Sequence, residues 1–79
     1  MKLSTLNYIH DLLKEDVKAK TNARSLLFDA AVKAEKEYLD SQTEENKTRW
    51  DTVENQYRQM AELLWKAEEV LADFEHKEW

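Results

Sequence analysis

The stretch from Trp50 to Phe74 constrains the fold of this chain more than any other. Apolar residues recur along it at alternating spacings of three and four: Trp50, Val53, Tyr57, Met60, Leu64, Ala67, Leu71 and Phe74. This heptad pattern is typical of a helix that packs lengthwise against another helix. The sequence therefore predicts a long amphipathic helix with a partner helix along one side.

A second apolar stripe runs through the first half of the chain and supplies that partner. Its members are Leu6, Ile9, Leu13, Ala23, Leu27, Ala30, Ala34 and Tyr38, with a gap at Asp16 and Lys20. The 79 residues include no glycine and no proline, so few turns are expected. We predict a single all-α domain, an antiparallel two-helix hairpin with one helix over about 5–40 and the other over about 43–78.

Eight polar residues, 40–47, interrupt both stripes and place the turn at about 40–42. Ser41 and Glu44 have the spacing of a capping box, which predicts that they start the second helix. Ser4 or Thr5 is expected to cap the first helix. The alternative is one continuous helix along the whole chain.

The hairpin predicts how the two stripes meet. Trp50 is expected to face the small residues Ala30 and Ala34, since large residues pack well against small ones. Asp16 and Lys20 occupy stripe positions of the first helix, four residues apart. They are expected either to form an ion pair that fixes the register or to lie where the stripe is exposed.

The chain carries more apolar residues than one hairpin can bury. Those beside the stripes form a candidate oligomer or partner surface: Leu12, Leu26, Phe28, Leu63, Trp65, Val70 and Trp79. Trp is favoured at binding hot spots, and Trp79 is expected to pack near Leu3 and Leu6 or on a second copy. We therefore predict a homodimer, a four-helix bundle with two-fold symmetry, and an unidentified protein partner.

The sequence contains no pattern that indicates catalysis. It has no cysteine, no nucleophile beside a base and no phosphate-binding loop, so we expect no enzymatic activity and no cofactor. A metal-binding bundle using His10, Asp73 and His76 is an alternative, because Asp73 and His76 have the spacing found in di-metal bundles.

The net charge of −5 arises entirely in residues 41–79, which disfavours nucleic acid and anionic membranes as partners. No stretch is apolar enough to span a membrane. An acid precedes a base by four residues in Glu45/Arg49, Glu54/Arg58, Glu62/Lys66 and Asp73/Lys77. These pairs are expected on solvent-facing surfaces. The acidic half suggests an alternative function, an inhibitor that mimics nucleic acid on a DNA- or RNA-binding protein.

Two segments carry a resemblance to known sequences. The opening Tyr8-Ile9-His10-Asp11-Leu12-Leu13-Lys14-Glu15-Asp16 and the ending Leu71-Ala72-Asp73-Phe74-Glu75-His76-Lys77-Glu78-Trp79 resemble the ends of short uncharacterised phage and prophage proteins. The resemblance implies an accessory protein in the cytoplasm of a bacterial host, and it assigns no functional residue. The absence of a signal peptide and of cysteine agrees with a cytoplasmic location.

Overall fold

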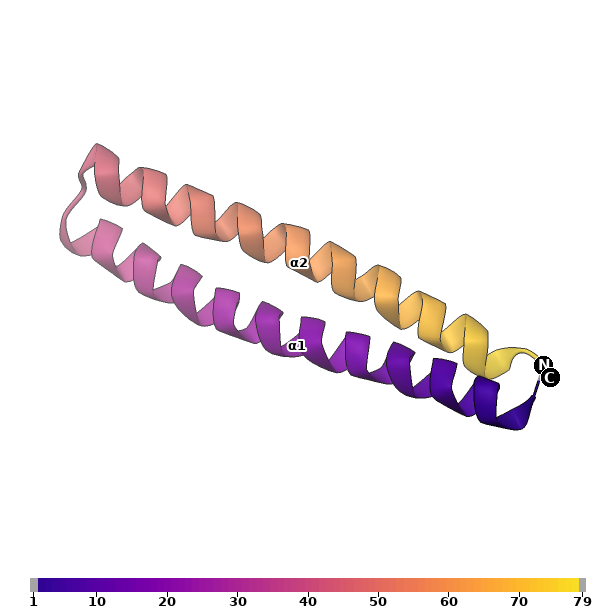
Figure 1. The fold of residues 1–79 in the computed structure, drawn as a ribbon. Helices are drawn as coiled ribbons and strands as arrows, with labels where there is room; N and C mark the ends of the chain where they lie inside the picture. The colour runs from indigo at the N-terminus through magenta and orange to yellow at the C-terminus, as the bar shows by residue number, and fades with distance from the viewer. Residues whose placement is uncertain (1, 79) are drawn as a thin grey trace.

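The computed structural model describes residues 2–78 and shows two helices joined by a short turn. Helix α1 spans Leu3–Asp40 and helix α2 spans Glu44–His76. They run antiparallel, and the start of α1 lies beside the end of α2, away from the turn (Figure 1). The predicted all-α hairpin is thus confirmed, and the alternative of one continuous helix is wrong. The hairpin is a rod of 58 × 14 × 13 Å.

The first helix begins earlier than its sequence suggested. Lys2 is the N-cap residue of α1 and makes no side-chain capping hydrogen bond. Ser4 and Thr5 lie inside the first turn, so the prediction that one of them caps this helix is wrong. At the other end of the chain, α2 ends at His76, slightly before the expected boundary at about residue 78.

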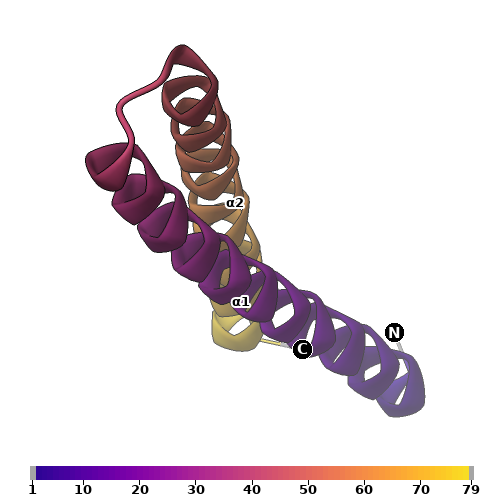
Figure 2. The ribbon, with the colours of Figure 1, turned by 90° about the vertical axis from the view of Figure 1, so that its left-hand side faces the viewer.

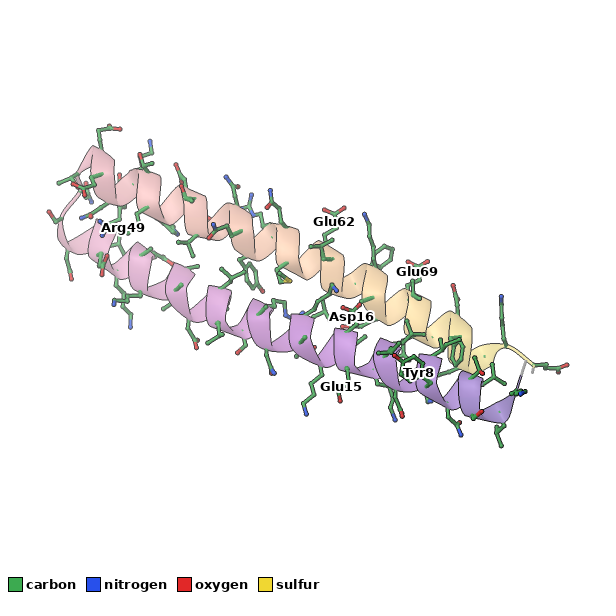
Figure 3. The ribbon with its side chains drawn as sticks, in the orientation of Figure 1. Tyr8, Glu15, Asp16, Arg49, Glu62 and Glu69 are labelled. Atoms are coloured by element: carbon green, nitrogen blue, oxygen red, sulfur yellow. The ribbon has the colours of Figure 1, made fainter. Side chains whose placement is uncertain are left out.

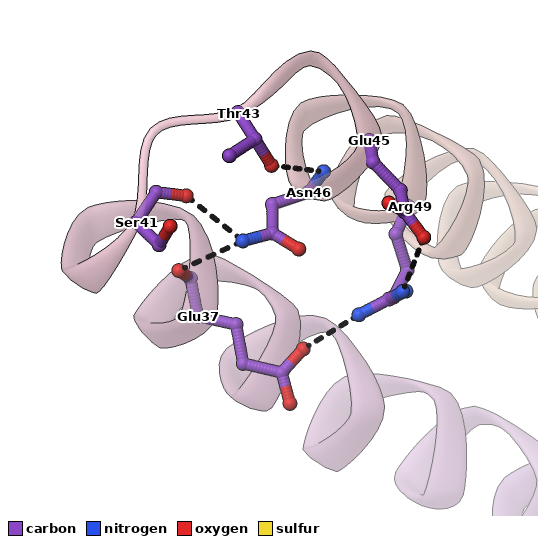
Figure 4. A network of polar contacts seen from close by, with 6 residues as sticks. All are labelled: Glu37, Ser41, Thr43, Glu45, Asn46 and Arg49. Atoms are coloured by element: carbon purple, nitrogen blue, oxygen red, sulfur yellow. Dashed lines mark hydrogen bonds and ion pairs between the residues drawn. The ribbon is translucent and has the colours of Figure 1, made fainter.

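Thr43, rather than Ser41, caps the second helix (Figure 4). Its side-chain oxygen accepts a hydrogen bond from the backbone N–H of Asn46 at 3.1 Å. The side-chain amide of Asn46 also donates to the backbone carbonyl oxygens of Ser41, at 2.8 Å, and of Glu37, at 3.4 Å. These bonds tie the end of α1 to the start of α2. The predicted capping box at Ser41 is therefore wrong, and the turn occupies residues 41–43.

The heptad stripe of α2 forms its contact with α1. All eight of its residues are buried or half-buried, and Leu64 is only 1% exposed. On α1, Ala34 is 4% exposed and Ile9, Leu13, Ala23 and Leu27 are half-buried. Ala30, which was expected in this contact, is exposed.

The stripe of α1 follows a different phase from the one its apolar residues suggested. Buried and half-buried residues recur at alternating steps of four and three: Leu6, His10, Leu13, Val17, Lys20, Arg24, Leu27, Ala31, Ala34 and Tyr38. Val17 and Ala31 replace Asp16 and Ala30 at the contact. Three of the ten positions therefore carry a basic side chain or an imidazole.

Ring contacts mark the register from the turn to the open end. Trp50 packs on Tyr38 with ring centroids 5.6 Å apart, and His10 stacks on Phe74 at 5.8 Å. Trp50 was expected against Ala30 and Ala34, so its main aromatic neighbour was missed. Seen from the turn, the two helices cross one another, as in a coiled coil (Figure 2).

Candidate interaction surface

Nine large apolar side chains of the described residues are exposed on the outside of the hairpin. Among the described residues, only Ala34 and Leu64 form a fully buried apolar core. The exposed large apolar residues are Leu3, Tyr8, Leu12, Leu26, Phe28, Leu39, Leu63, Trp65 and Val70. Monomeric proteins rarely leave contiguous apolar surface of this kind in water, so its distribution over the rod is the first indication of function.

Four of these residues share one side of the rod. On α2, Leu63 and Val70 line a hollow of about 250 Å³ with Leu13, Asp16 and Lys20 of α1. Val70 and Ile9 also line a neighbouring hollow of about 340 Å³.

Leu12 and Leu26 extend this side along α1. Leu12 follows Ile9 by three residues. Leu26 precedes Ala30 by four residues, and Ala30 lies three heptads after Ile9 and lines a further hollow on this side. Residues three and four apart share a helix face. We call the side that carries Leu12, Ala19, Leu26, Leu63 and Val70 the leucine face.

The remaining candidate residues do not belong to the leucine face. Trp65 follows Leu63 by two residues and Phe28 follows Leu26 by two, a rotation of about 200° around a helix. The surface predicted from the sequence as one set therefore divides between two sides of the hairpin. Trp65 is 63% exposed. Trp79 lies outside the described residues.

Phe28 packs within the hairpin, although it was expected on the oligomer or partner surface. Its ring lies 5.8 Å from that of Tyr57, and both line a hollow of about 420 Å³ with Thr21, Arg24 and Ser25. Phe28 is nevertheless 52% exposed. The sequence pattern missed this contact because Phe28 lies one position beyond the stripe residue Leu27.

Asp16 and Lys20 form the ion pair expected from their spacing. Lys20 keeps 28% of its side chain exposed and Asp16 keeps 47%, so the pair lies at the edge of the helix contact. In the view of Figure 3, Asp16 lies between the helices, whereas Glu62 and Glu69 point away from α1. The pair borders the leucine face and leaves it without an unmatched charge at that point.

Three acidic side chains of α2 pair with bases four residues later. Glu45 pairs with Arg49 at 3.4 Å, and Glu54 pairs with Arg58 at 2.8 Å. The predicted pair between Glu62 and Lys66 is also present, at 3.6 Å. Exposed pairs of this kind contribute only a few tenths of a kcal/mol to stability. They do interrupt the acidic surface that a mimic of nucleic acid would present.

The structure does not bring the three candidate metal ligands together. Nε2 of His10 lies 2.8 Å from a carboxylate oxygen of Glu75, across the two helices. Residues 2–78 contain no group of three or more His, Cys, Asp or Glu side chains placed to hold a metal ion. The contact of His10 with Glu75 instead joins the open end of the hairpin.

Comparisons with known proteins give this chain no relative. No family model matches it, and no curated protein or solved structure is significantly similar to it. Within residues 2–78, neither helix is long and apolar enough to cross a membrane.

Proposed function

We propose that this chain is a small non-enzymatic interaction module that self-associates and binds a protein partner through the outer faces of its helices. One observation carries the proposal: nine large apolar side chains of the described residues are exposed, whereas only Ala34 and Leu64 are fully buried. Burial of apolar surface stabilises an assembly by about 25 cal/mol per Å². A second hairpin is the simplest source of that burial.

A four-helix bundle built from two hairpins is the assembly that this shape supports. Two rods of 58 Å length can align their apolar sides, each filling the grooves of the other. Trp65, on the other side of the rod from Leu63, stays accessible in such a bundle. We assign Trp65 the role of binding a different protein, since Trp is favoured at the centres of binding sites.

The proposed setting is the bacterial cytoplasm, where the chain acts as a phage or prophage accessory protein. The resemblance of its two ends to such proteins supports this setting. Fractionation of cells that produce the protein tests the location. Recovery with the membrane or the periplasm contradicts it.

Light scattering at several protein concentrations tests self-association. The chain has a mass of 9.4 kDa, and we expect twice that mass at micromolar concentration. A helical monomer at every concentration contradicts the proposal.

For partner binding, a pull-down of the partner is repeated at rising salt and with the Trp65→Ala variant. We expect apolar binding that persists at high salt and weakens in this variant. Binding that salt abolishes supports the acidic inhibitor instead.

A further inference from the structure

We propose that the leucine face is the self-association surface, and that a second copy binds there with the two-fold axis at Ala19. In this arrangement α1 of one copy lies antiparallel to α1 of the other. The inference rests on the proposed self-association and adds which side of the rod is used and in which register. It leaves the opposite side, with Trp65, free for another partner.

The spacing of Leu12, Ala19 and Leu26 is self-complementary. They are seven residues apart, so they form one line along the exposed side of α1. Leu12 and Leu26 each lie about 10 Å from Ala19 along the helix axis. A two-fold axis at Ala19 therefore places Leu12 of each copy against Leu26 of the other, as a two-fold contact requires. The small side chain at the axis allows the two helices to approach closely.

Charges around Ala19 complement those of a second copy. Asp16 precedes Ala19 by three residues, and Lys20 follows it by one. In the antiparallel arrangement, Asp16 of one copy and Lys20 of the other differ in position by about 3 Å along the helix axis. The two Asp16–Lys20 pairs then lie beside the axis, and each pair is neutral. Ionic groups of this kind select a register, even where they add little affinity.

The antiparallel arrangement centred on the leucine face lets contact continue along the rod. From Leu12 to Leu26 the face covers about 21 Å of α1, and a whole side of the rod, 58 Å long and 14 Å wide, has a footprint of about 800 Å², the area per partner of a standard interface. Leu63 and Val70 of α2 widen the apolar strip beyond the line on α1. Lys66, the base that borders these two residues, is paired with Glu62 in the same chain. A second copy supplies an apolar strip of matching length.

Single-cysteine variants test this geometry, because the chain has no cysteine of its own. We expect Ala19→Cys to form a disulfide-linked dimer in most of the protein under mild oxidation, since the axis brings the two residues together. Ser25→Cys lies on the side that carries Phe28 and serves as the matched control. We expect little cross-linking there. A mixture of Leu12→Cys and Leu26→Cys is expected to cross-link several-fold more than either variant alone.

The outcomes separate the interface from the self-association on which it rests. A dimer by light scattering whose Ala19→Cys variant does not cross-link overturns the proposed face and leaves self-association standing. Equal cross-linking of Ala19→Cys and Ser25→Cys overturns it as well, because it indicates random collision. Helical monomers at every concentration overturn both. As a second measurement, Leu26→Glu is expected to weaken the dimer at least tenfold, whereas Trp65→Glu leaves it unchanged. The reverse result refutes the proposed face.

Discussion

Replacing Leu64 with alanine tests the packing of the hairpin at its most buried point. Leu64 is 1% exposed and is the largest side chain that the described residues bury fully. Leu→Ala changes in tight cores cost about 2–5 kcal/mol, the lost burial plus the cavity left behind. The hairpin is only 14 × 13 Å across, so its side chains have room to relax into the space. We therefore expect a loss of about 2–3 kcal/mol in the free energy of unfolding.

That loss is large for a chain of this size. A domain of 79 residues has a total stability of about 4–12 kcal/mol, so the variant loses about a sixth of it or more. Urea unfolding followed by circular dichroism at 222 nm measures the change. All variants are compared at one protein concentration, because self-association makes apparent stability depend on concentration.

Leu39→Ala is the matched control, since it removes the same atoms from a residue that is 60% exposed. We expect it to cost less than about 1 kcal/mol, because most of that side chain is already in water. Equal losses for the two variants refute the packing described for α2. A greater loss for Leu39→Ala shows that the burial pattern of the two helices is wrong.

Three further substitutions have definite expected outcomes in the same unfolding assay. Thr43→Ala removes the cap of α2 and should cost about 1 kcal/mol, whereas Ser41→Ala should cost little; the reverse order supports the capping box. Asn46→Ala removes both side-chain bonds to the end of α1 and should cost about 1–2 kcal/mol, and an unchanged midpoint excludes a role for them. The side chain of Arg24 makes no hydrogen bond or ion pair within residues 2–78, so Arg24→Leu should raise stability by about 1 kcal/mol. A loss instead shows that its guanidinium has a stabilising role.

The second helix was predictable because its stripe is apolar at every position. From Trp50 to Phe74 no charged residue interrupts the heptads, so periodicity alone indicates which side is buried. The polar run at 40–47 located the turn nearly as well. Thr43 was missed as the cap because Ser41 also offers a hydroxyl, and only the backbone geometry decides between them.

The first helix was placed out of phase for a physical reason. Its contact with α2 includes His10, Lys20 and Arg24, which a search for apolar residues rejects. Long basic side chains bury their aliphatic stems in such a contact and keep the charged end near water. The apolar residues Ala23 and Ala30 continue the stripe in the sequence, although only Ala23 is half-buried and Ala30 is exposed. Alanine is found on both buried and exposed sides of helices, so it does not indicate which side is buried.

The same shift of phase explains where the candidate site lies. Once Val17 and Lys20 face α2, the line of Leu12, Ala19 and Leu26 must point away from it. Helix α1 thus has basic side chains toward its partner helix and leucine toward the solvent along the same turns. A hairpin that only had to fold alone would be more stable with these two sets exchanged. The proposed self-association would cover the leucine face and so add to the stability of α1 itself.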